Sequence, residues 1–260
     1  MLDIFYMLED QELLVAERQD PYLRSHPLTR DRIRFVRNFV ENATYTSHIA
    51  GPEELMAHRR MLAKLYAFLN SPGRTLRAYR ENDLSQPARY ARAIAYHRIP
   101  DLERAIGEID ALLRDYPDDA WFRELKGQIL FENGHVALSI APYQSAVALR
   151  PDEPLLRLGL ARAQLELNQP EFTKKAIENL IAASRAEPNY SPHWHFLGIA
   201  YGRDGQLALS SLALAESALL NHEFVEAKYH SEKAKRGLAK GSPAYLRAED
   251  IAMAANQGKR

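Results

Sequence analysis

The chain has 260 residues, of which 46% are hydrophobic and 26% are charged, and its 34 Lys and Arg residues balance 34 Asp and Glu residues. This composition is typical of a folded, water-soluble protein and excludes a disordered chain. The net charge of zero argues against a nucleic-acid partner, because nucleic-acid-binding modules normally have a basic excess. The absence of cysteine excludes disulfides, thiolate zinc ligands and a cysteine nucleophile.

The N-terminal region shows no membrane span and no targeting signal. Apolar runs in the chain stay below the about 18 residues that a membrane span needs. The first residues are apolar, but Asp3, Glu9 and Asp10 stand where a signal peptide has its basic front end. Residues 2–18 have the pattern of an apolar helix that begins abruptly, so we expect Met1 to lie inside an element that continues upstream.

Residues 1–83 are predicted to form a helical extension that precedes the repeats described below. A loop punctuated by two prolines covers residues 20–32, and Thr29 is placed to cap the helix that follows. After a polar linker, Pro52 opens a further helix that is predicted to end near Leu69.

The strongest motif is S-P-H-W-H-F-L-G-I-A-Y, residues 191–201. Ser191 is placed to cap a helix. The spacing W-x2-L-G-x2-Y then puts four residues on one helical face and matches the first helix of the tetratricopeptide repeat. These residues are Trp194, Leu197, Gly198 and Tyr201. If the motif is a repeat, it should recur at about 34 residues.

The motif recurs, and the recurrence predicts an all-α tetratricopeptide superhelix of helical hairpins over residues 84–240. Prolines that end the second helix of each hairpin stand at Pro117, Pro151 and Pro188, which are 34 and 37 residues apart. The turn of the third hairpin, Asn168–Lys175, is predicted to be about three residues longer than the others. The predicted repeats are 86–117, 120–151, 154–188 and an irregular 191–237.

The fourth repeat is predicted to be irregular, because one of its helices belongs to two hairpins. The helix over residues 206–220 is placed to serve as the second helix of one hairpin and as the first helix of the next. The segment 241–260 is predicted to be a helix and a tail that cover the exposed end of the stack, because terminal repeats need a solubilising cap.

A search for catalytic motifs gives no reaction centre. A gluzincin peptidase needs H-E-x-x-H on a helix, and the nearest sequence is H-E-F-V-E, which begins at His222 and Glu223 and lacks the second histidine. We interpret this segment as a turn between helices. His193 and His195 point to different sides of their helix, which favours a surface role over a metal pair. We therefore predict no catalytic residue, no metal site and no cofactor in this chain.

Function must then come from the inner face of the superhelix, which the first helix of each hairpin lines. Aromatic, Arg and His side chains at inward positions suit the capture of an extended peptide. The predicted partner-binding groove consists of Tyr90, His97, Arg98, Trp121, Glu124, Gln128, Phe131, Arg162, His195 and Arg203.

Two alternatives stay open for this groove. Trp121 and Phe131 can instead pack between repeats. Arg98, Arg162 and Arg203 bind a carboxylate if they share one groove, but they carry no functional meaning if they are merely solvated. Whether residues 1–80 of the chain themselves occupy the groove is also open.

Three stretches resemble a known family. They are Q-D-P-Y-L-R-S-H-P-L-T-R-D-R-I (19–33), P-A-R-Y-A-R-A-I-A-Y-H-R-I-P-D-L (87–102) and E-L-K-G-Q (124–128). They look like the C-terminal half of bacterial zinc metalloproteases with tetratricopeptide repeats, the BepA-like relatives of the HtpX peptidases. The resemblance covers nearly the whole chain. It implies a preceding zinc peptidase domain, and it places His26 and Arg32 at the interface with that domain. The alternative is that His26 only belongs to a loop that leads into a helix.

The resemblance also implies a cellular role. The family is exported to the periplasm and acts in quality control of outer-membrane proteins. We therefore expect a non-catalytic scaffold that binds a protein partner or client for an attached zinc metalloprotease. One alternative is a zinc-dependent peptidase in its own right, with His26, His222 and Glu223 assembled in space. Another is a self-assembly module that forms a homo-oligomer through its apolar N-terminal helix.

Overall fold

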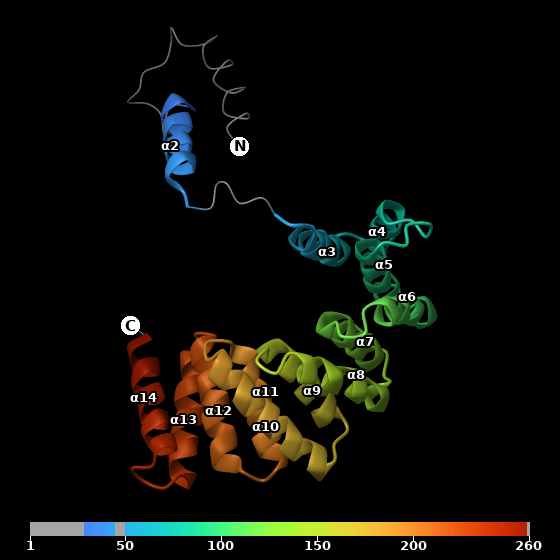
Figure 1. The fold of residues 1–260 in the computed structure, drawn as a ribbon. Helices are drawn as coiled ribbons and strands as arrows, with labels where there is room; N and C mark the ends of the chain where they lie inside the picture. The colour runs from blue at the N-terminus through green and yellow to red at the C-terminus, as the bar shows by residue number, and fades with distance from the viewer. Residues whose placement is uncertain (1–28, 45–49, 259–260) are drawn as a thin grey trace. The chain divides into compact units, whose positions relative to one another are not determined.

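The computed structural model describes residues 29–44 and 50–258, and every regular element in these two ranges is an α-helix (Figure 1). The helices are α2 (Thr29–Asn42), α3 (Pro52–Leu69), α4 (Pro72–Ala78), α5 (Gln86–Arg98), α6 (Leu102–Asp115), α7 (Ala120–Glu132), α8 (Val136–Leu149), α9 (Pro154–Glu166), α10 (Pro170–Ala186), α11 (Ser191–Arg203), α12 (Leu207–Leu220), α13 (Phe224–Gly237) and α14 (Pro243–Gly258).

The chain divides into two compact parts, Met1–Ala57 and His58–Arg260, and each is described by itself. The division lies inside α3 and not after residue 83, where the sequence placed the end of the extension. The reason is that α4 packs on α5, and the last turns of α3 share a core with α5. Ala63 and Ala67 are fully buried in the same cluster as Tyr90.

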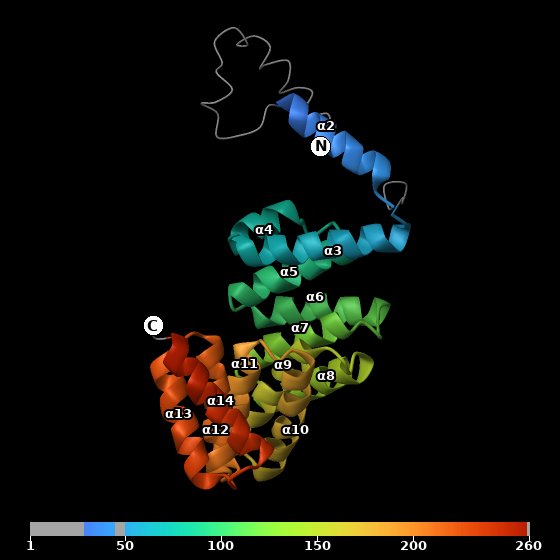
Figure 2. The same ribbon diagram turned by 90° about the vertical axis from the view of Figure 1, so that its left-hand side faces the viewer.

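The helical hairpins repeat at the predicted period. Helices α5, α7, α9 and α11 begin at residues 86, 120, 154 and 191, which are 34, 34 and 37 residues apart. Each packs on the helix that follows it, and successive helices from α4 to α7 lie one upon another (Figure 2). The fold is therefore an all-α tetratricopeptide superhelix, as the motif spacing predicts.

The three extra residues of the third repeat lie in a helix and not in a turn. The connection between α9 and α10 is only residues 167–169, whereas α10 has 17 residues and α6 and α8 have 14 each. The predicted long turn Asn168–Lys175 is thus wrong. Pro170 opens α10 at its first position, where a missing N–H leaves no hydrogen bond unmade.

The signature helix α11 packs as its motif predicts. Leu197 is buried, and the indole N–H of Trp194 donates to the carbonyl of Pro188 at 2.8 Å. A Cβ on Gly198 would lie 2.7 Å from Cγ of Leu214, so only glycine lets α12 approach this closely. The motif therefore fixes the distance between two neighbouring helices.

The predicted cap at Ser191 is wrong. Ser191 is the first residue inside α11, and Tyr190 stands at the capping position without a side-chain capping bond. The Ser191 hydroxyl instead lies 3.3 Å from the hydroxyl of Ser217 on α12. The side chain therefore serves the contact between two helices and not the free N–H groups of its own.

Tyr143 forms the closest contact between the second and third repeats. Its ring fills the space that side chains would need at two glycines, since a Cβ on either Gly127 or Gly159 would lie 2.8 Å from a ring carbon. The ring is 4% exposed. Three helices, α7, α8 and α9, thus meet around one aromatic side chain.

Helix α12 has neighbours on both sides, as the sequence predicted. It packs on α11 and on α13, and it also contacts α14 (Figure 1). The contact with α14 contains an ion pair between a buried carboxylate and an exposed arginine: Arg247 donates from Nε and Nη2 to the two oxygens of Glu216 at 2.5 and 2.7 Å. Helix α14 therefore covers α12 with both apolar and charged contacts.

Candidate functional site

Three successive first helices bring side chains together on one face, which we call the inner face. Arg162 of α9 lies between an aromatic ring of α7 and one of α11: its guanidinium carbon is 5.5 Å from the ring centres of both Phe131 and Phe196. The three residues stand eleven, eight and five positions after the first residue of their helices. The stack therefore runs diagonally across three repeats, one helical turn earlier on each.

Arg162 is the unengaged cation of this face. Its side chain is exposed and makes no hydrogen bond or ion pair with any residue that the structure describes. Glu166 lies one helical turn further along α9, where an ion pair would be possible, but the two side chains do not pair. Two aromatic rings contact the guanidinium group, and its N–H donors stay available for a ligand.

Beside the stack, α7 carries a carboxylate network that is already satisfied. Nε2 of His97 lies 2.8 Å from Oε2 of Glu132, and the amide of Gln128 donates to the other oxygen of Glu132 at 2.9 Å. His97 is 9% exposed. Two predicted groove residues, His97 and Gln128, therefore both contact Glu132 across α5 and α7, and Glu132 forms no ion pair with Arg162.

Glu124 supplies a second carboxyl group on α7, in a partly desolvated position. Burial raises its pKa, and the charge of Lys64 on α3 opposes that shift. The phenol of Tyr143 lies within the fields of Glu124 and Arg162, and its pKa is raised chiefly by burial. The inner face thus presents an acidic group and a basic group on neighbouring helices.

The first turns of this face are covered by the chain itself. Arg60 of α3 forms an ion pair with Asp119 and lies 5.0 Å from the ring centre of Phe122. The ammonium of Lys64 lies 5.8 Å from the ring centre of Trp121. Residues 58–69 therefore lie against the first turn of α7. The sequence left open whether residues 1–80 occupy the groove, and this part of them covers its α7 end.

Tyr90 lies beneath α3 and is part of the core. Its ring is 1% exposed and packs edge-to-face on Phe122, with 5.1 Å between ring centres. The expectation that Tyr90 lines an open groove is therefore wrong, because α3 lies over the position that an inward residue of α5 would present.

Two of the three predicted arginines cap helices. Nη1 of Arg98 donates to the carbonyls of Ala67 and Asn70 at 2.5 Å each, at the end of α3. Arg203 donates in the same way to the carbonyl of Leu165, near the end of α9. These bonds satisfy carbonyls that the helix leaves unpaired. The three arginines do not share one ligand site, and only Arg162 remains for a partner.

The remaining predicted residues are placed as follows. His195 is exposed on α11, and its ring lies 5.5 Å from that of Phe196. Arg32 is half-buried on α2, in the first part of the chain. His26 and the apolar segment 2–18 lie outside the described residues, so the peptidase-domain interface and the self-assembly helix stay predictions.

The peptidase alternative depends on a metal site and on the segment that begins with His222 and Glu223. The described residues contain no group of three or more His, Cys, Asp or Glu side chains that could hold a metal ion. His222 lies in the turn between α12 and α13 with a φ of 62°, and Glu223 stands just before α13. The H-E-F-V-E segment is thus a turn and a helix start. Among the described helices, none combines the length and the apolar character that a membrane span requires.

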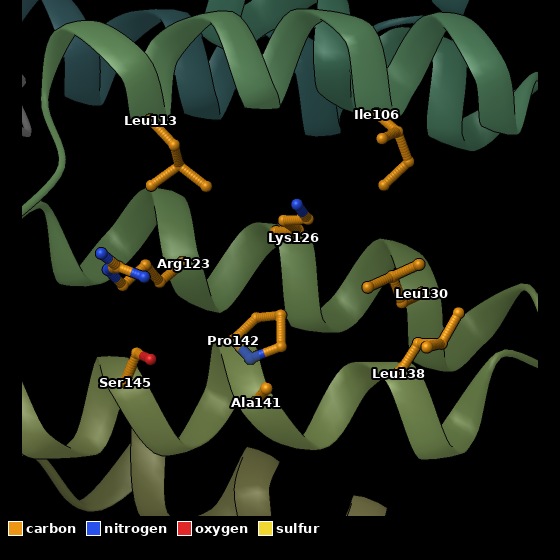
Figure 3. A pocket seen from close by; sticks show the side chains of 9 residues that line it. All are labelled: Ile106, Leu113, Arg123, Lys126, Leu130, Leu138, Ala141, Pro142 and Ser145. Atoms are coloured by element: carbon orange, nitrogen blue, oxygen red, sulfur yellow. The ribbon is translucent and has the colours of Figure 1, made fainter.

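A second concavity lies away from the inner face, between the outer helices α6 and α8. Figure 3 shows its side chains, with those of α7 between those of α6 and α8. Its volume is about 490 Å³. The lining residues are Ile106, Leu113, Arg123, Lys126, Leu130, Leu138, Ala141, Pro142 and Ser145.

The cations of this outer pocket are already engaged. Lys126 lies 2.6 Å from Asp110, and Nε and Nη2 of Arg123 donate to the carbonyl of Pro117 at 2.9 and 2.7 Å. Pro142 lies inside α8, and its missing N–H leaves the carbonyl of Leu138 without a helical partner. The pocket therefore offers apolar contact and lacks the free cation of the inner face.

The helical hairpins and their 34-residue period define a tetratricopeptide-repeat fold. The family model described as "Tetratricopeptide repeat" matches residues 90–154 and 124–171. The β-barrel assembly-enhancing protease of Yersinia pestis is 26% identical over 230 residues, which are 87% of this chain and 46% of that protein. The chain thus spans about half the length of this relative. It is similar to the tetratricopeptide half of such a protease, as the resemblance implied.

Solved structures share the fold. YrrB, described as a tetratricopeptide-repeat protein with an unusual peptide-binding site, has a TM-score of 0.52 and 18% identity, over 76% of this chain and 97% of YrrB. MamA from AMB-1 also has a TM-score of 0.52, with 17% identity over 64% of this chain and 98% of MamA. At identities this low, the similarity shows the fold alone.

Sequence reasoning missed three inner-face residues: Lys64, Glu132 and Phe196. Lys64 lies outside the repeats, so the repeat alignment gives it no position. Phe196 and Glu132 follow directly after predicted groove residues, and the repeat alignment gave them no inward position. The available signal was diagonal spacing, because a step of one turn per repeat from Phe131 leads to Arg162 and then to Phe196.

Proposed function

We propose that this chain is a non-catalytic interaction module that binds an extended segment of a partner protein along its inner face. The observation that carries the proposal is the diagonal stack of Phe131, Arg162 and Phe196, which presents an exposed cation that has no counter-ion among the described residues. The other two predicted groove arginines, Arg98 and Arg203, are engaged by backbone carbonyls. A preorganised but unengaged group is typical of a binding surface.

The module serves an attached zinc metalloprotease in the bacterial envelope. The support is the similarity to the tetratricopeptide half of a β-barrel assembly-enhancing protease. On this proposal the peptidase domain holds the zinc, and the clients are unfolded outer-membrane β-barrel polypeptides in the periplasm. The description of YrrB as a peptide-binding repeat protein supports the same mode of binding.

Site-specific photocrosslinking tests the binding face. A photoreactive residue is placed at Gln128 or His195 on the inner face, or at Lys174 on α10 as an exposed control. An outer-membrane β-barrel polypeptide, unfolded in urea and then diluted into buffer, serves as the client. We expect crosslinks from the two inner-face positions and none from Lys174.

Crosslinking from Leu138 in the outer pocket, without crosslinking from the inner face, would contradict the proposal and move the binding site to α6 and α8. The non-catalytic part is tested separately by titrating zinc into the purified chain in a calorimeter. Tight one-to-one zinc binding together with chelator-sensitive cleavage of casein would favour the peptidase alternative.

A further inference from the structure

We infer that Arg162 is the receptor for an acidic side chain, Asp or Glu, within the bound segment. The inference rests on the proposed function and adds the chemistry by which the inner face selects its partner. Three observations carry it: the geometry of the stack, the absence of a counter-ion within residues 29–44 and 50–258, and the continuation of the inner face on both sides of Arg162.

Two aromatic rings position the cation for a ligand. The rings of Phe131 and Phe196 lie against the guanidinium group from two neighbouring helices. Such stacking holds the planar group in place and partly shields it from water. The N–H donors point outward from the edge of the group, and two parallel donors match the two oxygens of a carboxylate. An amide or a hydroxyl offers only one acceptor and no charge.

The nearby acids do not neutralise Arg162. Glu132 is held by His97 and Gln128 through both of its oxygens. Glu166 stands one turn away without forming a pair, and the described acids include none within ion-pair distance of Arg162. Glu124 is the remaining carboxyl group of the face, and it interacts with Lys64. The ligand must therefore supply the counter-ion.

The position of Arg162 favours a side chain within a chain over a C-terminal carboxylate. The inner face continues toward α7 through Gln128 and toward α11 through His195. A segment that ended at Arg162 would leave one of these sides unused. An extended segment that crosses all three helices places an internal residue over the stack.

Capped peptides test the inference directly. Acetylated and amidated decapeptides that tile an outer-membrane β-barrel polypeptide are screened by fluorescence anisotropy, and the tightest acidic binder is compared with its Glu→Gln or Asp→Asn counterparts. We expect one acid-to-amide change to weaken binding by about tenfold or more, as a charge-assisted pair predicts. Arg162→Gln should weaken binding of the acidic peptide to the level of the amide peptide and leave the amide peptide unaffected.

Arg114→Gln on α6 is the matched control, because Arg114 is also exposed and has no ion pair among the described residues. It should change neither affinity. Arg162→Lys keeps the charge but loses the two-donor edge, so it should give an intermediate affinity. Circular dichroism and thermal melting of each variant show whether it is folded before binding is compared.

The outcomes separate the two proposals. If peptides bind but wild-type affinity is equal for the acid and the amide, the inference is wrong and the proposed function stands. The same holds if binding requires an uncapped C-terminus in a peptide without Asp or Glu. If no peptide or unfolded polypeptide binds to the wild-type chain, both proposals are wrong.

Discussion

At the scale of single residues, Tyr143 shows how strictly the repeat interface limits substitution. The ring occupies the space where Gly127 and Gly159 would carry a Cβ. The repeat alignment gave no sign that one tyrosine touches two glycines. That information depends on the angle between neighbouring hairpins, which spacing alone does not fix.

Gly127→Ala should therefore destabilise the fold. The added methyl would lie 2.8 Å from two ring carbons of Tyr143, which is buried and has little room to move. Overpacking of this kind lowers the free energy of unfolding by about 1–3 kcal/mol. Urea denaturation followed by circular dichroism measures the change.

Gly107→Ala is the matched control on α6. No atom lies within 4 Å of a Cβ at this position. Alanine in a helix interior should then raise the free energy of unfolding by about 0.5–1 kcal/mol, because it reduces the freedom of the unfolded chain. A loss of stability in both variants would mean that backbone strain, and not contact with Tyr143, is responsible.

His193 should make stability depend on pH. It is fully buried, and burial lowers its pKa from the ordinary value of 6.5. The unfolded chain then binds a proton at a higher pH than the folded chain does. The contribution to stability is fully present above pH 6.5 and is lost as the pH falls below that value toward the pKa of the folded state.

The measurement is the free energy of unfolding of wild type and His193→Gln at about pH 7.5 and about pH 5.5. The variant should lose less stability on acidification, whatever its stability at the higher pH. His230 has a pKa that is lowered first by burial and then by Lys233, so His230→Gln should remove a further part of the slope. An unchanged slope in both variants would contradict this account.

At the scale of elements, buried ion pairs join helices that apolar contacts hold only in part. Arg92 of α5 is 1% exposed, donates to both oxygens of Glu108 on α6, and donates to the carbonyls of Arg80 and Asp83 before α5. The sequence showed only an arginine inside a predicted helix. Its four acceptor atoms come from two segments, α6 and the connection between α4 and α5, and no local pattern brings them together.

Arg92→Met should lower the free energy of unfolding by about 3–5 kcal/mol, because Glu108 would stay behind without its partner. Arg104→Met is the matched control, since Arg104 is exposed and pairs with Asp101 only three residues away. It should change stability by less than about 1 kcal/mol. Thermal melting ranks the two variants, and equal losses would show that Arg92 has no special role.

The pair of Glu216 and Arg247 fixes the last helix. Glu216 is 5% exposed, so Arg247→Met would leave a buried carboxylate without a counter-ion. In a repeat array each hairpin contacts only its neighbours, so the effect should stay local. Hydrogen exchange should rise in α13 and α14 and stay unchanged in α5–α8. A uniform rise along the chain would mean that the array unfolds as one unit.

At the scale of the whole molecule, the sequence predicted the repeats well and the site only in part. Prolines and small residues at a constant period report local helix ends and close contacts, and these survive in any single sequence. The groove was harder to predict because first-helix position alone does not tell whether a side chain is covered or engaged. Tyr90 is covered by α3, and Arg98 and Arg203 are engaged by carbonyls of neighbouring helices.

Because α12 belongs to two hairpins, the order of first and second helices changes at α12, as the order of layers changes at a stacking fault in a crystal. Before α12, hairpins succeed one another in a fixed phase; after it, the helix that closed one hairpin opens the next. A duplicated copy of residues 120–153 inserted after Glu153 keeps the phase and lengthens the track, whereas a copy inserted within α12 does not. On the proposed function, gene duplication on the N-terminal side of α12 would therefore lengthen the segment of partner that the inner face binds.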